Sequence, residues 1–485
     1  MGVFPEDTEI RVSLLIKLWV AEGFLKPISG KSLEVVAEDY FNDLIDRNLI
    51  LVHTRTTSGK IKFCKIHDLL RDLCLREAEK EKFLFFLRKN SPDSLQCLNT
   101  ERRIVVHSGT SYNENSHQLS YGFQSTSVAR SFISDSVGYM PPFTCRLLRV
   151  LQADSAKLYL GSSREDEYFI KDVFQLVNLW HLAFQVESNL NLVYLLWNLQ
   201  TLIIKSTPWQ TVALSEIWLM PHLRHVFVDK FHHPDPPCVE YMPVFVLRNL
   251  QTLLMITNFK CSEDVVKRIP NIKKLQLCYK GSEEDLERYC LNNLGHLHKL
   301  ESLTCEFYFS KKRIRNYLVQ NITFPQSLKK LTLEGSRLHW DEMSSKVGSL
   351  PLLQVLKLKE HSCIGPKWVP DEGQFCSLKF LLIEWCEDLE YWMADNANFP
   401  RLEKLVLRFL DNLKEVPSGI GDIPTLRPIQ LTHCSHYAVF SAKKIVDGQE
   451  ELGNEDLKVQ VLAQAKDEIV KRLESRNFQV QTASW

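Results

Sequence analysis

Apolar residues recur along this chain in one short pattern. Residues 353–358, LQVLKL, read L-x-x-L-x-L, and similar stretches begin at twelve positions from residue 148 onward. The steps between them run from 20 to 31 residues and average about 25. The stretches begin at Leu148, Leu179, Leu199, Leu223, Leu250, Ile272, Leu300, Leu328, Leu353, Leu378, Leu402 and Leu426.

This spacing lies in or near the range of leucine-rich repeats. In each unit the pattern places alternate side chains of a short strand on one face, and only stacked neighbours can bury such faces. Cys386 and Cys434 add the polar spacer of the longer form, L-x-x-L-x-L-x-x-C, where a small inward side chain fits. Residues 147–435 are therefore predicted to form an α/β leucine-rich-repeat solenoid, or horseshoe.

Residues 1–90 have a different pattern. Apolar residues at helical spacing predict helices over 11–22 and 33–45, the first ended by Gly23 and the second capped by Ser32. Alternating residues predict strands over 49–53 and 61–66. Helix, helix and hairpin is the order of a winged helix, so the fold class is α+β: a winged-helix domain followed by the solenoid.

A third helix is expected from Leu69, with Leu70, Leu73 and Cys74 facing inward and Asp68 as its N-cap. On these residues alone, the sequence Ile-His-Asp at 66–68 reads as a strand end, a surface imidazole and a helix cap. The functional interpretation of His67 needs a resemblance to known proteins.

The flanking regions are predicted to cover the ends of the solenoid. Residues 91–146 form a transition with strand candidates at 102–107 and 129–133, interpreted as degenerate capping repeats, with a flexible linker as the alternative. Residues 436–485 are expected to be a C-terminal cap and tail: a helix over 437–452, a strand over 457–461 and a charged helical segment over 466–476.

Bulk composition excludes several classes of partner and setting. Lysine plus arginine and aspartate plus glutamate both number 59, so no strong attraction to nucleic acid is expected. The chain has no secretory signal and no apolar stretch long enough to span a membrane. With scattered cysteines, this predicts a cytoplasmic protein with free thiols, peripheral membrane contact being the alternative. No grouping of catalytic residues stands out, so no enzyme is predicted.

The positions between the repeat anchors are expected to point outward on the concave face. Exposed apolar residues among charges are typical of a protein-binding patch, and a solvated face is the alternative. His225 lies on this predicted face. The candidate binding residues are Phe227, Lys274, Lys330, Lys357, Lys359, Phe380, Leu382, Lys404, Val406 and Arg408.

Two other groups carry a structural interpretation. Trp340, Trp368, Trp385 and Trp392 are expected to fill the solenoid core or its convex side. Residues 232–238, HHPDPPC, contain possible metal ligands, but the prolines favour an exposed loop, and no metal site is predicted.

The motifs FPEDTEI, LIKLWVAEGFL, VAEDYFNDLIDRNLI and KIHDLLRDLCLREA resemble plant NLR immune receptors of the coiled-coil class, specifically the late-blight-resistance type. The resemblance covers the whole chain and implies a disease resistance protein whose NB-ARC switch module ends in this winged helix. His67 and Asp68 fall on the family's Met-His-Asp motif. By that resemblance His67 senses the β-phosphate of ADP and Asp68 supports it.

The chain departs from the family pattern because it has no G-x-x-x-x-G-K-[ST] phosphate loop. It begins partway through the pattern, as an N-terminally truncated member would. ADP or ATP is thus implied as cofactor of the full-length family and not of this chain alone. The implied partners are a pathogen effector or guarded host protein, and NB-ARC modules. The alternative function is a ubiquitin-ligase substrate adaptor, against which the predicted hairpin argues.

Overall fold

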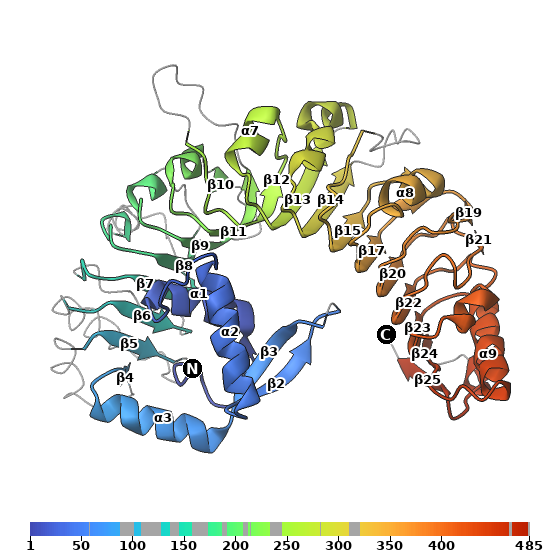
Figure 1. Ribbon diagram of the computed structural model, residues 1–485, viewed down its shortest axis with the longest axis horizontal. Helices are drawn as coiled ribbons and strands as arrows, with labels where there is room; N and C mark the ends of the chain where they lie inside the picture. The colour runs from blue at the N-terminus through green and yellow to red at the C-terminus, as the bar shows by residue number, and fades with distance from the viewer. Residues whose placement is uncertain are drawn as a thin grey trace. The chain divides into compact units, whose positions relative to one another are not determined.

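The computed structural model (Figure 1) describes residues 1–57, 59–87, 101–107, 128–135, 145–157, 173–186, 192–206, 212–213, 215–232, 245–281, 283–309, 321–464 and 468–483. The chain forms two compact units, residues 1–256 and 257–485. The repeats are thus divided between both units.

The first unit opens with the predicted winged helix. It comprises β1 (Ile10–Arg11), α1 (Val12–Glu22), α2 (Leu33–Asp46), β2 (Ile50–Arg55), β3 (Ile61–Ile66) and α3 (Asp68–Lys80). β3 pairs antiparallel with both β1 and β2. Gly23 ends α1 with a φ of 73°, a left-handed conformation that glycine adopts at low cost, and the Ser32 hydroxyl accepts the Val35 N–H at the start of α2. Both predicted helix boundaries are confirmed.

The same unit continues into a parallel sheet. Its strands are β4 (Phe85–Leu87), β5 (Arg103–Val106), β6 (Ser131–Ser134), β7 (Val150–Lys157), β8 (His181–Val186), β9 (Thr201–Ser206), β10 (Val212–Ala213), β11 (His225–His232) and β12 (Thr252–Thr257). Each of β4 to β8 pairs in parallel with the strand that follows it, and β9 pairs with β11. Both strand candidates of the transition, β5 and β6, therefore belong to the repeat sheet. Short 3₁₀ helices at Val193–Leu195 and Ser215–Leu219 connect successive strands.

The second unit is a parallel sheet of the same construction. Nine of its strands pair in the order β13 (Lys274–Gly281), β14 (Ser302–Phe309), β15 (Lys330–Glu334), β17 (Val355–Lys359), β20 (Phe380–Glu384), β22 (Lys404–Arg408), β23 (Pro428–Thr432), β24 (Lys458–Gln464) and β25 (Phe478–Ala483). The segments that precede and connect these strands lie on the face opposite the sheet (Figure 1). They contain α7 (Glu263–Arg268), α8 (Trp340–Val347) and the 3₁₀ helices Glu283–Tyr289, Leu291–His296 and Ser418–Asp422. They also contain four two-residue strands: β16 (Leu338–His339), β18 (Cys363–Ile364), β19 (Lys367–Trp368) and β21 (Tyr391–Trp392).

The repeat anchors stack because the strands keep register. Leu356 of β17 lies opposite Leu381 of β20, and Leu381 opposite Leu405 of β22. All three side chains are fully buried. Burying such a leucine contributes about 2 kcal/mol, and its repetition at every strand builds one continuous core. The predicted leucine-rich-repeat fold and the α+β class are confirmed.

The C-terminal segment extends the repeats further than predicted. The helix α9 (His436–Glu451) and strand β24 appear where expected. In the described part of the charged segment, from residue 468 on, the helix is the short α10 (Glu468–Lys471), after which β25 pairs in parallel with β24. The alternation of Phe478 and Val480 with polar residues had signalled this last strand.

Two predictions of burial are wrong. Leu73 and Cys74 of α3 are exposed, Leu70 is only half-buried, and the helix has no buried residue, because no described element packs against that face. Trp385 is 39% exposed, whereas Trp340, Trp368 and Trp392 stack in the core with ring centroids 4.8 and 5.3 Å apart. Among the described residues, no helix is long and apolar enough to cross a membrane.

Candidate functional site

His67 and Asp68 lie at the start of α3, on the surface of the winged helix. The imidazole Nδ1 accepts the Leu69 N–H at 3.4 Å, so His67 is the N-cap and Asp68 is the first helical residue. The prediction that Asp68 caps the helix is therefore wrong by one position, because the His67 imidazole accepts a free backbone N–H in the first turn of the helix. Both side chains are exposed. A ligand could reach the other imidazole nitrogen without a rearrangement of the helix.

Within the first unit, the winged helix is bound to the repeats through Glu34 of α2. Its carboxylate accepts two hydrogen bonds from Arg224, at 2.6 and 2.5 Å, one from Gln251 at 3.0 Å and one from His225 Nε2 at 3.2 Å. These four residues are named the Glu34 cluster. Arg224 and Gln251 directly precede β11 and β12, so one carboxylate joins two successive repeats to the winged helix.

The Glu34 cluster is nearly dry, which strengthens its electrostatics. Burial alone would raise the pKa of Glu34, but the hydrogen bonds from His225 and Arg224 and the charge of Arg224 outweigh it and hold that pKa well below its usual value. Burial lowers the pKa of His225 to about 4, so its ring is neutral at pH 7. The neutral tautomer that donates from Nε2 to Glu34 leaves Nδ1 to accept from Thr252 at 3.2 Å. His225, expected on an open concave face, is instead buried beneath α2.

A second part of this interface lies along α1 (Figure 1). Glu22 accepts hydrogen bonds from Arg103 Nε at 2.9 Å and from the Ser131 hydroxyl of β6. On the same helix, Leu18 and Ala21 pack on Val150 of β7. Apolar burial flanked by two buried carboxylates fixes the winged helix to the repeat strands in one orientation.

In the second unit, part of the predicted binding face is already neutralised. Lys359 Nζ lies 3.8 Å from carboxylate oxygens of both Glu334 and Glu384, and Arg408 lies 3.3 Å from Glu384. The register places these four side chains in one row across β15, β17, β20 and β22. Because each cation shares a carboxylate, Lys359 and Arg408 offer a partner less charge than their sequence positions suggest.

Lys357 and Lys404 are different, because neither forms an ion pair among the described residues. Burial first, and then the charges of Lys330, Lys359 and Arg408, lower the pKa of Lys357. Burial and Arg408 lower that of Lys404. The Lys357 Nζ lies 5.5 Å from the centre of the Phe380 ring. Glu384 offsets part of this effect at Lys357, but no carboxylate pairs directly with either lysine, so a carboxylate from outside would be attracted.

The apolar residues beneath these lysines are not exposed, contrary to the prediction. Phe380, Leu382 and Val406 are 6%, 5% and 2% exposed, and they pack with Val355 as one cluster. Outward positions on adjacent strands are about 5 Å apart, close enough for large side chains to cover each other. Lys357, Lys404 and this apolar cluster are named the lysine patch.

The remaining candidates are only partly brought together. Lys274 on β13 is exposed, and Lys330 on β15 is half-buried. Phe227 is half-buried on β11 of the first unit, the strand that begins at His225 of the Glu34 cluster. Of the possible metal ligands at 232–238, only His232 is described. Within the described ranges, no group of three or more His, Cys, Asp or Glu could hold a metal ion.

Sequence reasoning missed a row of three stacked rings at the ends of successive strands. Trp385 and Phe409 stack with centroids 4.1 Å apart, and Phe409 and His433 with centroids 5.4 Å apart. These residues are named the aromatic stripe. All three have left-handed backbones, with φ of 55°, 53° and 48°. The signal was present, since Trp385 and His433 each directly precede the repeat cysteine.

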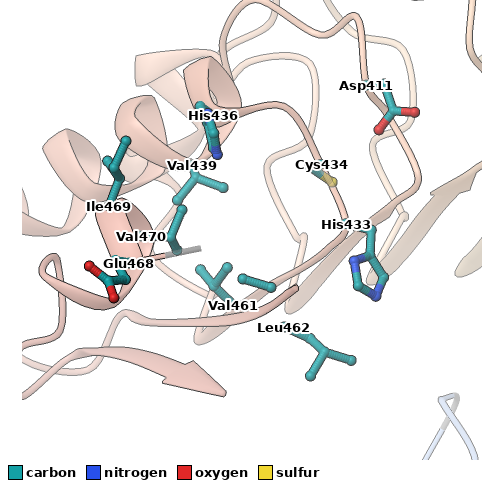
Figure 2. Close-up of a pocket in the computed structure, with 11 residues that line it drawn as sticks. Asp411, His433, Cys434, His436, Val439, Val461, Leu462, Glu468, Ile469 and Val470 are labelled. Carbon is teal, nitrogen blue, oxygen red and sulfur yellow. The ribbon is translucent and has the colours of Figure 1, made fainter. Parts of the chain in front are cut away.

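Beside His433 lies a pocket of about 600 Å³ (Figure 2). Its carboxylates, Asp411 and Glu468, lie on opposite sides of the opening. Apolar side chains from α9, β24 and α10 form its wall: Val439, Val461, Leu462, Ile469 and Val470. The eleven described residues that line it include no lysine or arginine.

Comparison with known proteins gives this geometry a context. Residues 3–74 match a family model described as the disease resistance protein winged helix domain. The chain is 31% identical over 478 residues to a putative late blight resistance protein homolog of Solanum demissum, with 93% of this chain and 35% of that protein covered. Late blight resistance protein R1-A of the same species is 31% identical over 472 residues, with 93% and 35% covered.

A third relative, another putative late blight resistance protein homolog from Solanum demissum, is 31% identical over 479 residues, covering 93% of the chain and 58% of that protein. The chain thus spans between a third and three fifths of the length of these relatives. A solved structure of the plant peptide hormone receptor RGFR1 in complex with RGF2 aligns at a TM-score of 0.41 and 13% identity, covering 81% of this chain and 69% of the receptor.

Proposed function

We propose that this chain, a relative of the late blight resistance proteins of Solanum, is the recognition and restraint portion of a plant disease resistance receptor. The role is one of binding, and no catalytic step is assigned to it. The observation that carries the proposal is that the strands of the two units present different side chains. Those of the first unit bind the winged helix through the Glu34 cluster, whereas those of the second carry the unpaired cations of the lysine patch.

Restraint is the role proposed for the Glu34 cluster. Breaking a buried ion pair by removing one partner costs about 3–5 kcal/mol, because the other charge stays buried without compensation. Separation of the winged helix from the repeats would leave both Glu34 and Arg224 to find new partners. A competing interaction that favours the separated state would therefore shift the winged helix away from the repeats.

Recognition is the role proposed for the lysine patch. Two cations without carboxylate partners, placed over an apolar cluster, favour a protein surface that brings acidic and apolar side chains together. Carboxylates of such a partner would raise the pKa values of Lys357 and Lys404 back towards that of an ordinary lysine, because a nearby anion favours the charged form. The proposed partner is a pathogen protein or a host protein that carries an acidic patch.

Nucleotide sensing belongs to the longer receptor in this proposal. By family resemblance, His67 would contact the β-phosphate of ADP cradled by a segment upstream of the winged helix, and its exposed position on α3 allows such a contact. A cytoplasmic setting is proposed along with it. The described residues contain no phosphate-binding loop of the G-x-x-x-x-G-K-[ST] type, so ADP or ATP is proposed as a cofactor of the longer receptor only.

The test is a chimera of protein R1-A in which this chain replaces the matching segment, expressed in leaf tissue and scored for cell death without a pathogen. Glu34→Arg should release the restraint and cause cell death, whereas Glu38→Arg, on the exposed side of α2, should stay quiet. Adding Lys357→Glu and Lys404→Glu to the Glu34→Arg chimera should leave its cell death intact, because recognition acts before release. A Glu34→Arg chimera as quiet as the Glu38→Arg control would overturn the proposal.

A further inference from the structure

The aromatic stripe is a surface feature that the repeat fold does not require. Left-handed backbones are rare for bulky residues and persist only where the surroundings enforce them. Here each backbone N–H donates to the next repeat: Trp385 to the Arg408 carbonyl at 3.1 Å, Phe409 to Thr432 at 2.9 Å and His433 to Leu462 at 3.0 Å. These hydrogen bonds hold the same backbone turn at three successive strands, and each turn carries an aromatic ring. Trp385 is 39% exposed.

The unpaired charges that follow the stripe in the sequence are acidic. Glu387 and Asp411 follow Trp385 and Phe409 by two residues, and both are exposed. Glu468 lies across the pocket from Asp411 (Figure 2). None of these three carboxylates has an ion pair among the residues that the structure describes. Phosphate groups and acidic peptides would be repelled here, in contrast to the lysine patch on the preceding part of the same strands.

We propose that the aromatic stripe and the pocket beside His433 form a docking site for an extended, arginine-bearing segment of a partner protein. Charge complementarity selects a cation, and the apolar wall and flat rings select arginine over lysine. A guanidinium group is weakly hydrated, forms paired hydrogen bonds to a carboxylate, and packs its plane and stem against aromatic and aliphatic surfaces.

In the bound arrangement, the guanidinium pairs with Asp411 or with Glu468 at the edge of the pocket, and its aliphatic stem packs on the apolar wall between them. The preceding residues of the segment run along Phe409 and Trp385. Arginine and aromatic residues dominate the binding energy of protein interfaces when they are desolvated in such pockets. The proposal uses residues outside the lysine patch, so it does not depend on the acidic partner proposed above.

The experiment is selection of phage-displayed random peptides on the purified full chain, read by sequencing. Peptides enriched on the wild type should share an arginine next to apolar residues. In fluorescence anisotropy, the enriched peptide should bind about tenfold or more weakly to the Asp411→Asn/Glu468→Gln variant, and Trp385→Ala should weaken it further. A version of the enriched peptide in which the arginine is replaced by glutamine should bind the wild-type chain as weakly as the unchanged peptide binds the double variant.

A Glu287→Gln/Glu372→Gln variant is the matched control, since it removes two exposed carboxylates outside the pocket and should bind like the wild type. Circular dichroism confirms the fold of each variant. The proposal is overturned if no basic motif is enriched, if acidic peptides are enriched, or if the double variant binds the peptide as tightly as the control. Failure of the leaf assay would leave these results unaffected, because the selection involves no immune response.

Discussion

Substitution of Glu34 by alanine is the sharpest test of how the winged helix is held. The change removes the acceptor of four hydrogen bonds and leaves the Arg224 guanidinium, whose side chain is 14% exposed, without its counter-ion. We expect the free energy of opening this interface to fall by about 3 kcal/mol, the lower end for a broken buried pair, because water reaches both side chains in part. At about 1.4 kcal/mol per factor of ten, the open population rises roughly a hundredfold.

Hydrogen exchange measured by mass spectrometry reports that population directly, since amides that exchange through opening accelerate by the same factor. Peptides from the start of α2 and from β11 should exchange faster in Glu34→Ala, and peptides from β22 should not. Glu38→Ala on the same helix controls for the change in helix propensity. A paired Glu34→Arg/Arg224→Glu variant should recover part of the protection. Equal exchange of the α2 peptides in Glu34→Ala and Glu38→Ala would refute the assigned role.

Three further predictions follow from the same contacts. His225 has a pKa of about 4 in the closed interface, so between pH 6.5 and 4 its ring is protonated in the open form only. The free energy of opening should therefore fall as the pH is lowered, by about 2 kcal/mol at pH 5. In His225→Gln, hydrogen exchange should no longer show this dependence on pH. His67→Ala and Asp68→Ala should each cost only about 0.5 kcal/mol in thermal unfolding, since both are exposed at a helix start; a large loss at either would mean a buried structural role. Trp368→Ala, which opens a cavity between Trp340 and Trp392, should cost about 3–5 kcal/mol in urea unfolding of the second unit; a loss below about 1 kcal/mol would mean that the stack relaxes around the gap.

The repeats were predictable because their stability depends on a local pattern. Leu356, Leu381 and Leu405 are buried for the same reason at each turn, and the spacing of apolar residues reveals this without knowledge of any distant contact. The winged helix was predictable for a similar reason. Its two packed helices carry apolar stripes at helical spacing, and Ser32 and Gly23 mark their ends with local backbone chemistry.

The predictions that were wrong depend on neighbours that a pattern does not specify. Leu73 and Cys74 have inward spacing, yet no described element packs on their face of α3. Phe380 and Leu382 occupy outward positions, yet the adjacent strands and the stem of Lys357 cover them. Trp385 resembled the three core tryptophans in the sequence, yet it lies just past the end of β20 with its ring partly exposed.

The role of Glu34 could not be predicted from the sequence, because its partners are separated from it by 190 residues or more along the chain. Glu34 looked like a solvated residue in the first turn of a helix, and Arg224 and Gln251 looked like ordinary polar positions between repeats. The domain boundaries predicted at residues 90, 146 and 435 remain predictions, as does the adenine nucleotide of the longer receptor.

The Glu34 cluster also bears on how the protein is made. Glu34 and Arg224 are separated by 190 residues, so at about 5–20 residues per second a ribosome needs roughly 10–40 seconds to supply the second partner after the first. During that interval the winged helix can fold, but the Glu34 carboxylate has no partner until Arg224 is made, and Leu18, Ala21 and Glu22 have none until the strands that carry Ser131 and Val150 are made. A chaperone that shields this face during synthesis would prevent nascent chains from associating through it.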